Sequence, residues 1–472
     1  MEHFEIYAAG KFLRTSNTFQ VTNPYDNSVI AETSKAGKEE LETSIQQAQS
    51  VEQEMAEFPG WKRTAVLLEI ASELENNLEY HAKLLAMEAG KPMRYATGEV
   101  KRAIQTFRIA GEEARRLPSE HISLDWTQAG EGREGWVKYF PIGLVAAIAP
   151  FNFPLNLATH KIAPAIAAGC PVILKPASST PLSTLALAKI IDNTDLPKGV
   201  FSVLPMDRES GNQLVTDERF KLLTFTGSPE VGWNMKNNAG KKKVVLELGG
   251  NAGVIISRDA DIDHAVRKCL TGAFAYSGQV CIHAQRIFVE SDIFEEFTLK
   301  FKLETEKLKT GTPLDESTDI SAMIDKNNAE RVEQWISEAE EQGAKVITGG
   351  IRDNTIVKPT ILTNTNSMMK VCAQEVFGPV VAVEPFNDYN EALNMINDSR
   401  YGLQAGIFTD SIERMNQAWK KLDVGGIIMN DVPTFRVDHM PYGGVKDSGL
   451  GREGVKYSIH DMMEPKILVK NS

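Results

Sequence analysis

From residue 137 onward, short apolar or β-branched runs alternate with helical segments, and this alternation limits the fold more than any other feature. The runs read LVAAIA, PVILK, GVFSVL, KLLTFTG and KKVVLEL, with helical sequence between them. Strands that alternate with helices at this spacing form βαβ units around a parallel sheet. Such a sheet binds ligands beyond the carboxyl ends of its strands. The residues that directly follow each run are therefore the first candidates for a site.

The rest of the chain divides around this sheet. Helical periodicity is clear in residues 38–58, 63–89 and 99–117, and a second alternating block runs from Ala252 to about Asp423. We predict an α/β fold with one parallel-sheet domain formed by residues 1–120 and 141–250 and a second α/β domain formed by 251–425. Residues 426–454 are predicted to return to the mouth of the site, and residues 121–140 and 455–472 to form a small β-projection for contacts between subunits.

Charge and cysteine content exclude several classes of protein. The formal net charge of −12 disfavours nucleic acid and anionic membranes as partners. Four scattered cysteines, without a CxxC pair, argue against a disulfide framework or a zinc site and favour a reducing compartment. The start of the chain lacks a signal-peptide pattern, and its longest apolar run, Ile142–Phe151, is too short to span a bilayer. We therefore expect a cytoplasmic enzyme without a metal ion.

The stretch GLGREG, Gly449–Gly454, matches the GxGxxG pattern of dinucleotide-binding loops but lacks its context. That fingerprint follows a strand, opens a helix and has an acidic residue about 20 positions later. Here a loop precedes it and only 18 residues remain after Gly454. A glycine-rich turn near a domain junction is the better interpretation.

Polar residues follow the predicted strands. Asn152 precedes a proline that opens a helix, where its amide could donate to an oxyanion or simply cap the helix. Lys175 closes one strand and suits a ribose or phosphate contact, or it is solvated. Gly227 and Ser228 begin a helix whose free N–H groups could face a phosphate, although ordinary capping explains them equally well.

Glu247 and Cys281 bring the most specific chemistry. Glu247 ends an apolar strand, where a carboxylate is unfavourable unless it is paired, transfers a proton, or points to solvent through strand alternation. Cys281 lies in YSGQVCIHAQR, between a flexible approach and a β-prone run. A thiol with an ordinary pKa of about 8.5 needs help to react at neutral pH. Together Asn152, Glu247 and Cys281 offer an oxyanion donor, a base and a nucleophile.

The motifs PFNFPLN, KPA, FTGS, LELGGN, GQVC, EVFGPV and PYGGVKDSGLGREG, in this order, resemble the NAD(P)-dependent aldehyde dehydrogenase superfamily over nearly the whole chain. The resemblance implies a Rossmann-like cofactor domain and a catalytic domain that carries the nucleophile. It also implies that Cys281 attacks an aldehyde to give a thiohemiacetal, whose oxyanion is held by Asn152 and the Cys281 N–H. Loss of hydride leaves a thioester, and Glu247 activates the water that releases the acid.

For the cofactor, the resemblance assigns contacts to Lys175, Gly227, Ser228, Leu248, Glu375 and Phe377. Many NAD-preferring members carry a glutamate three residues after the KPA lysine, and this chain has Ser178 there. Without that carboxylate a 2′-phosphate is no longer repelled, and Lys175 can pair with it. We therefore predict that NADP is accepted, with NAD also usable; which of the two is preferred stays open.

One helix face and two arginines are the candidates for binding the substrate. On the helix begun at Pro154, Phe153, Leu157 and His160 share the face that lines the aldehyde tunnel in the family, and Arg108 and Arg436 are predicted beside the tunnel and its mouth. The alternatives are a surface arginine for Arg108 and a core histidine for His160. The similarity favours lactaldehyde- and glycolaldehyde-type enzymes acting on a small hydroxylated or anionic aldehyde, in a homodimer or homotetramer.

Three other functions are alternatives to a hydrolytic aldehyde dehydrogenase. Two lie within the superfamily: a CoA-acylating semialdehyde dehydrogenase, and a non-phosphorylating glyceraldehyde-3-phosphate dehydrogenase. Enzymes of the first kind commonly lack the water-activating glutamate, whereas Glu247 is present. The third is a cysteine hydrolase that pairs Cys281 with His283, two residues later on a likely strand and without an evident orienting carboxylate.

Overall fold

The computed structural model describes residues 2–471, and two parallel-strand sheets dominate it. The first sheet contains β2 (Ile6–Ala8), β3 (Lys11–Leu13), β8 (Val145–Ile148), β9 (Val172–Lys175), β10 (Phe201–Val203), β11 (Leu222–Thr226), β12 (Lys243–Glu247) and β24 (Gly449–Leu450). Their order is β24-β12-β11-β8-β9-β10-β2-β3, and β8 to β12 are mutually parallel. The chain adds β9 and β10 on one side of β8, and then β11 and β12 on its other side. The strand order therefore reverses between β8 and β11, which creates a crevice at their carboxyl ends.

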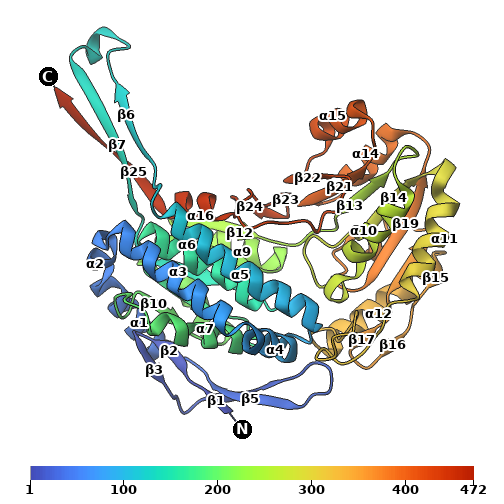
Figure 1. Ribbon diagram of the computed structural model, residues 1–472, viewed down its shortest axis with the longest axis horizontal. Coiled ribbons are helices and arrows are strands. Elements are labelled where there is room, and N and C mark those ends of the chain that lie inside the picture. The colour runs from blue at the N-terminus through green and yellow to red at the C-terminus, as the bar shows by residue number, and fades with distance from the viewer. Residues whose placement is uncertain (1, 472) are drawn as a thin grey trace.

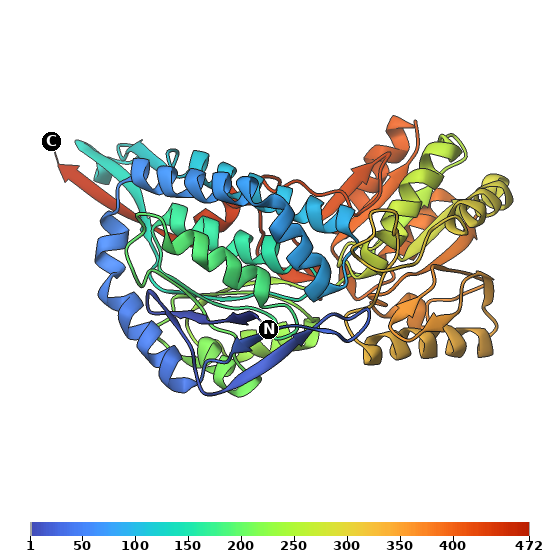
Figure 2. The same cartoon turned by 60° about the horizontal axis from the view of Figure 1, so that its bottom comes forward.

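Helices cover both faces of this sheet, as Figure 2 shows. They are α1 (Lys38–Ser50), α2 (Glu52–Glu57), α3 (Gly60–Asn76), α4 (Leu78–Ala89), α5 (Met93–Glu113), α6 (Pro154–Ala168), α7 (Leu182–Asp192), α8 (Arg208–Thr216), α9 (Pro229–Asn238) and α16 (Val455–Asp461). Alternation along β8 sends Val145 and Ala147 into the core beneath α3 to α7, and Ala146 and Ile148 into the core beneath α1 and α8. Burial on both faces explains why these strands are uniformly apolar.

The second sheet occupies the other half of the molecule (Figure 1). Its strands are β13 (Gly253–Ile256), β14 (Arg286–Glu290), β15 (Lys345–Thr348), β18 (Thr360–Thr363), β19 (Val380–Phe386), β21 (Gln404–Phe408) and β22 (Gly426–Met429), in the order β15-β18-β19-β14-β13-β21-β22. The accompanying helices are α10 (Ile262–Phe274), α11 (Phe294–Thr305), α12 (Lys326–Glu341), α13 (Lys370–Ala373), α14 (Tyr389–Asn397) and α15 (Ile412–Lys421). Cys281 lies in the loop before β14, so it meets this sheet at the amino end of a strand.

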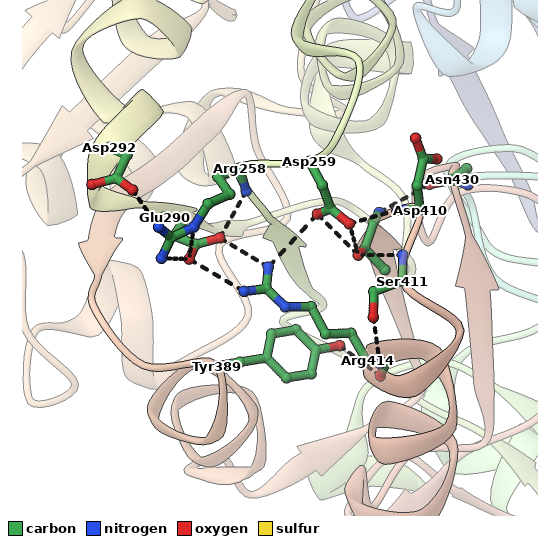
Figure 3. A network of polar contacts seen from close by, with 10 residues as sticks. Arg258, Asp259, Glu290, Asp292, Tyr389, Asp410, Ser411, Arg414 and Asn430 are labelled. Atoms are coloured by element: carbon green, nitrogen blue, oxygen red, sulfur yellow. Dashed lines mark hydrogen bonds and ion pairs between the residues drawn. The ribbon is translucent and has the colours of Figure 1, made fainter.

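The carboxyl ends of β13, β14 and β21 are closed by ion pairs (Figure 3). Glu290, at the end of β14, accepts hydrogen bonds from the Arg258 backbone N–H at 2.7 Å and from Arg414 Nη1 at 2.9 Å. Asp259 accepts from the Thr409 hydroxyl at 2.8 Å and from the Asp410 N–H at 3.0 Å. These polar and charged groups bond to one another and fill the carboxyl end of the second sheet, where a parallel sheet usually binds its ligand.

A three-stranded antiparallel sheet projects from the body (Figure 1). It consists of β6 (Ser119–Ser123), β7 (Arg133–Pro141) and β25 (Met463–Asn471), in the order β25-β7-β6. Smaller sheets pair β1 (Glu2–Phe4) and β4 (Thr18–Thr22) with β5 (Val29–Ser34), β16 (Arg352–Asp353) with β17 (Ile356–Val357), and β20 (Tyr401–Gly402) with β23 (Val445–Lys446).

Several element boundaries differ from those expected from sequence. Residues 455–461, assigned to the projection, form α16, whose Val455 and Ile459 join the core beneath α6. The helix expected over 63–89 is two helices, because Asn77 leaves helical geometry and its side chain binds the Glu73 carbonyl at 2.9 Å. The Gly449–Gly454 stretch contributes β24, which pairs with β12, and then a turn.

Candidate active site

The approach to Cys281 is a run of left-handed backbone. Tyr276, Ser277 and Gly278 have φ of 49°, 53° and 68°, a conformation that side-chain-bearing residues adopt only at a cost. Hydrogen bonds hold it, from the Tyr276 hydroxyl to the Ala89 carbonyl at 2.9 Å and from Ser277 Oγ to the Ser321 carbonyl at 2.8 Å. A Cβ atom at position 278 would lie 2.1 Å from the Gly378 carbonyl oxygen, so glycine is required there.

The thiol of Cys281 opens on a cavity but is closely surrounded. Its Sγ lies 3.1 Å from the hydroxyl oxygen of Tyr442. Burial raises the pKa of the thiol to about 11, while Tyr442 and Arg436 act to lower it and the carboxylates of Glu375 and Glu247 act to raise it. The environment by itself therefore keeps the sulfur a neutral thiol near pH 7.

Asn152 lies beside the same loop. It follows β8, just before α6, and its Nδ2 donates to the Gln279 carbonyl at 3.0 Å, two residues before the cysteine. Lys91 fixes the backbone of Asn152 by donating to its carbonyl at 2.6 Å and also forms a buried ion pair with Glu99. The amide is thus held on a rigid support and its N–H₂ points toward the nucleophile's segment.

Glu247, the last residue of β12, is 3% exposed, and neither of its carboxylate oxygens has a hydrogen-bond partner among residues 2–471. Burial first, and then the charge of Glu453, raise its pKa well above the usual value. A buried carboxyl without partners is unfavourable for stability and points to a role in proton transfer. A Cβ at Gly443 would come within 2.8 Å of Glu247 Oε1, so the backbone passes close by.

A buried charge cluster lies next to Glu247. Glu453 accepts from Lys161 Nζ at 3.1 Å and from Arg436 Nη2 at 3.0 Å. Burial opposes ionisation of Glu453, but the two cations hold its pKa below the usual value. Lys161 also donates to the hydroxyls of Thr224 and Thr226 on β11, at 3.2 and 2.8 Å.

Asn152, Glu247 and Cys281 border a cavity of about 670 Å³ between the two sheets. Nine of the residues predicted from sequence line it: Asn152, Leu157, Gly227, Ser228, Glu247, Leu248, Cys281, Glu375 and Phe377. Glu375 accepts from the Gly250 N–H at 3.0 Å, and burial raises its pKa to about 7. Phe377 packs edge-on against Phe151, with 5.8 Å between the centroids of the two rings.

The cavity fits a dinucleotide. Residues 227–231 place the start of α9 on its wall, and Ser228 does not cap that helix with its side chain, so its first N–H groups remain available to a phosphate. A Cβ atom at position 227 would lie 2.4 Å from the Phe225 ring, so the chain has no room for a side chain there. The backbone of Gly227 therefore faces the cavity directly. The wall therefore presents backbone donors rather than side chains at this point.

Two neighbouring cations, Lys175 and Arg208, form no ion pair among residues 2–471; Arg208 lines the cavity, whereas Lys175 does not and is attracted by the nearby Asp207. Lys175 Nζ makes only a long bond of 3.4 Å to the neighbouring Pro176 carbonyl, and burial lowers its pKa. Ser178 is exposed nearby in sequence. Arg208, exposed at the start of α8, lines the cavity and forms no ion pair among residues 2–471. Sequence reasoning missed Arg208, because DRES reads as an ordinary helix start.

The remaining predicted substrate residues separate in space. Phe153 packs against Tyr276 at 6.0 Å, and His160 is buried with its Nε2 2.8 Å from Asp438 Oδ1. The structure does not bring Arg108 to the cavity, because its side chain is directed to Glu75 on α3 at 2.5 Å.

The arginine of α5 that bonds to Asp438, the partner of His160, is Arg102. It donates to Asp438 at 2.7 Å, the oxygen that His160 also faces. Arg102 precedes Arg108 by about one and two-thirds helical turns, so the two point to different faces. The expectation for Arg108 came from the family resemblance, which places this helix beside the tunnel but does not fix which of its residues faces inward.

No helix in residues 2–471 is long and apolar enough to cross a bilayer. The same residues contain no group of three or more His, Cys, Asp or Glu side chains arranged for a metal ion. His283 does not serve as a base for Cys281, since Sγ faces Tyr442 and burial lowers the histidine pKa to about 4.

Comparison with known proteins identifies the class. A model of the aldehyde dehydrogenase family matches residues 12–468. The chain belongs to this family. As an aldehyde dehydrogenase it is an oxidoreductase that acts on aldehydes, and its α/β fold agrees with the prediction from sequence.

Two curated relatives of this aldehyde dehydrogenase are similar over almost their full length. The 3-sulfolactaldehyde dehydrogenase of Priestia aryabhattai is 44% identical over 472 residues, covering 100% of this chain and 98% of that protein. A lactaldehyde dehydrogenase of Methanococcus aeolicus is 42% identical over 460 residues, covering 96% and 97%.

Solved structures agree closely with this one. Aldehyde dehydrogenase 21 from Physcomitrella patens, in complex with the reaction product succinate, matches with a TM-score of 0.98 and 44% identity, covering 100% of this chain and 98% of that one. A glyceraldehyde-3-phosphate dehydrogenase from Methanocaldococcus jannaschii, complexed with NADP, matches with a TM-score of 0.93 and 38% identity, covering 96% and 99%.

The left-handed approach to Cys281 yields a prediction with a matched control. Gly278→Ala and Gly240→Ala both place a side chain at positive φ, at a cost of about 1–2 kcal/mol each, but only position 278 is crowded, since nothing lies within 4 Å of a Cβ at Gly240. We expect Gly278→Ala to lower aldehyde oxidation at least about tenfold, because the loop must move, and Gly240→Ala to keep the parental rate. Urea unfolding and initial rates measure both effects; equal activity of the two variants would contradict the analysis.

Proposed function

We propose that this aldehyde dehydrogenase oxidises a small anionic or hydroxylated aldehyde to its carboxylic acid, with Cys281 as nucleophile, Asn152 as oxyanion donor and Glu247 as base. The observation that carries the proposal is that the thiol, the amide and an unpartnered carboxyl from three separate segments border one cavity. A covalent mechanism needs this combination of groups.

The residues divide the reaction between them. Cys281 Sγ, after losing its proton, forms a bond to the aldehyde carbon, and the carbonyl oxygen becomes an oxyanion. The Asn152 amide and the Cys281 N–H donate to that oxyanion and stabilise it as its charge develops. A bound nicotinamide cofactor supplies the acceptor for the hydride that leaves this carbon. Glu247 then takes a proton from water, whose oxygen displaces sulfur and releases the acid.

Glu247 favours hydrolytic release over transfer of the acyl group to another thiol. Its oxygens make no hydrogen bond in the described chain, so they are free to bind water. The raised pKa also makes it a better base once ionised than an exposed glutamate. A CoA-acylating reaction has no use for such a group at this position.

Two substitutions and one control variant test the chemistry. Cys281→Ala should abolish aldehyde-dependent reduction of cofactor, and Cys269→Ala, which alters a core thiol, should retain it. Glu247→Gln should give a burst of about one reduced cofactor per site and then turn over roughly 100-fold more slowly, because deacylation loses its base.

The pH profile adds a second readout of the same prediction. Only the ionised Glu247 acts as a base, so the parental steady-state rate should fall as pH drops through the raised pKa of this group. Stopped-flow absorbance of reduced cofactor separates burst from steady state. A Cys281→Ala protein with parental activity would refute the mechanism.

The cofactor proposal is NADP, with NAD as a weaker alternative. Supporting it are Arg208 on the cavity wall and the neighbouring Lys175, neither of which forms an ion pair among residues 2–471, and a neutral Ser178 where many NAD-preferring members have a glutamate. A 2′-phosphate carries charge that two cations stabilise and a carboxylate would repel. The solved relative from Methanocaldococcus jannaschii binds NADP.

Cofactor kinetics check this proposal. We expect kcat/KM for NADP to exceed that for NAD, and Arg208→Gln to lower the NADP value about tenfold, as loss of a charge-assisted hydrogen bond predicts. The NAD value should change less than about twofold. Ser178→Glu should shift the ratio further toward NAD. A parent enzyme that strongly prefers NAD would overturn it.

The substrate proposal depends on Arg436. The side chain of this arginine is 6% exposed and stacks on Tyr442, with its guanidinium carbon 3.7 Å from the ring centroid. Tyr442 in turn reaches Sγ, so one tyrosine ring separates the cation from the nucleophile. We expect the substrate to reach from Cys281 Sγ to Arg436. Such an aldehyde is only a few atoms long, and it carries an anionic or hydroxyl group at the end away from its carbonyl. The curated relatives named for 3-sulfolactaldehyde and lactaldehyde support this class.

A panel of aldehydes checks the substrate class. Succinate semialdehyde, 3-sulfolactaldehyde, lactaldehyde, glycolaldehyde, glyceraldehyde 3-phosphate and hexanal should separate the candidates, with hexanal poorest. Arg436→Gln should lower kcat/KM for the anionic aldehydes by about tenfold or more, and for propanal less, because the variant loses an ion pair. Arg108→Gln, which alters a half-buried arginine of α5 that does not line the cavity, is the matched control and should change neither value. Hexanal as the best substrate would contradict the proposal.

We also infer an oligomer, a homodimer or homotetramer, in the cytoplasm. The projection formed by β6, β7 and β25 exposes apolar side chains, including Leu468 at 68% and Val469 at 48% exposure, which a second copy would cover. The four cysteines are unpaired, which suits a reducing compartment. Light scattering of the purified protein distinguishes dimer from tetramer.

A further inference from the structure

Tyr442 is the polar partner of the nucleophile, and the motifs assigned no role to it. It lies in the returning segment, far from Cys281 in sequence, and is 3% exposed. Its hydroxyl oxygen is 3.1 Å from Sγ. A phenylalanine would fill the same space, so the hydroxyl is the feature that needs an explanation.

The position of Tyr442 is fixed from two directions. Its N–H donates to the Glu453 carbonyl at 2.9 Å, and the Glu453 N–H donates back at 2.6 Å. The Glu453 carboxylate binds Arg436 at 3.0 Å, and Arg436 covers the Tyr442 ring at 3.7 Å. Glu453 therefore holds both the tyrosine backbone and the cation above its ring, and the ring cannot turn away from the sulfur without disturbing this arrangement.

We propose that Tyr442 is a positioning residue whose hydroxyl donates a hydrogen bond to the Cys281 thiolate, strengthened by Arg436 on the face of its ring. The inference rests on the proposed role of Cys281 as nucleophile. A cation above an aromatic face draws electron density from the ring and makes its O–H a better donor. The proton lost by Sγ goes to solvent in the cavity, and the tyrosine keeps its own.

The other charged groups around Sγ make this bond necessary. Glu247, from β12, and Glu375, from the loop after α13, both disfavour a negative sulfur, and so does burial. Arg436 and the Tyr442 hydroxyl are the groups that favour the negative sulfur. The Tyr442 pKa is raised well above its usual value, first by burial, so the hydroxyl remains a donor over the whole working range of pH.

Alkylation of the thiol tests the inference without any turnover. In the absence of cofactor, iodoacetamide should modify Cys281 of Tyr442→Phe about tenfold more slowly than the parent between pH 7.5 and 9. The reason is that loss of one hydrogen bond to a charged acceptor raises the thiol pKa by about one unit. The pH profile should shift upward by the same amount. Mass spectrometry of the Cys281 peptide follows the reaction, and the buried cysteines report whether the variant has loosened.

The matched control is Tyr401→Phe, which removes a hydroxyl from a tyrosine that lines the cavity next to Cys281 but is not bonded to sulfur. It should leave the profile of Cys281 unchanged. Arg436→Gln should slow alkylation in the parent but less in the Tyr442→Phe background, because part of the effect of Arg436 passes through the ring.

Each remaining outcome has one meaning. A Tyr442→Phe protein alkylated within twofold of the parent overturns the inference, as does an equal loss in Tyr401→Phe. If instead Cys281→Ala keeps aldehyde oxidation, the proposed function itself fails. The two failures are therefore distinguishable.

Discussion

A single buried carboxylate, that of Glu453, joins the parts of the chain from which the active site is built. It binds Lys161 on α6 and Arg436 in the returning segment, and its backbone pairs with Tyr442. Lys161 in turn reaches the hydroxyls at the end of β11. Because a buried carboxylate is tolerated only with such partners, the first sheet and the returning segment must assemble together.

The charge balance of this cluster also governs Glu247. Lys161 and Arg436 carry two positive charges against the one negative charge of Glu453, so the cluster has a net positive charge of one when Glu247 is neutral. Ionisation of Glu247 would neutralise it, although burial and the nearby Glu453 hold the pKa high. The pKa of the carboxyl is therefore raised, so it holds a proton more strongly than an exposed glutamate, which suits a group that must accept a proton from water.

The parts of this arrangement that sequence predicts are those that follow from local pattern. The βαβ alternation gives the first sheet, and its carboxyl-end rule finds Asn152, Gly227 and Glu247 on one cavity. Cys281 does not obey that rule, since it lies before β14 and the carboxyl end of that strand is closed by Glu290. Its position was inferred from family resemblance instead.

What the sequence does not reveal are contacts between distant segments. Nothing local marks Tyr442 as a neighbour of Cys281, because the two are joined only through the pairing of Tyr442 with Glu453 and the packing of the returning segment. Arg102 and Arg108 both lie on α5, and choosing between them needs the helix phase relative to α3 and Asp438. An exposed arginine such as Arg208 is ordinary until the fold places it on a cavity wall.

Three of the nine non-glycine residues with positive φ in the described chain lie where the two sheets face each other. Tyr276, Ser277 and Phe377 all have positive φ, and each lies in a loop that reaches the nucleophile or the cavity. Neither loop would hold such a conformation alone, since each non-glycine residue of this kind costs of order 1–3 kcal/mol. Their anchors, the Ala89 and Ser321 carbonyls for the first loop, belong to other parts of the fold. The cores of the two sheets therefore supply the stability that keeps the cysteine, the amide and the carboxyl in register.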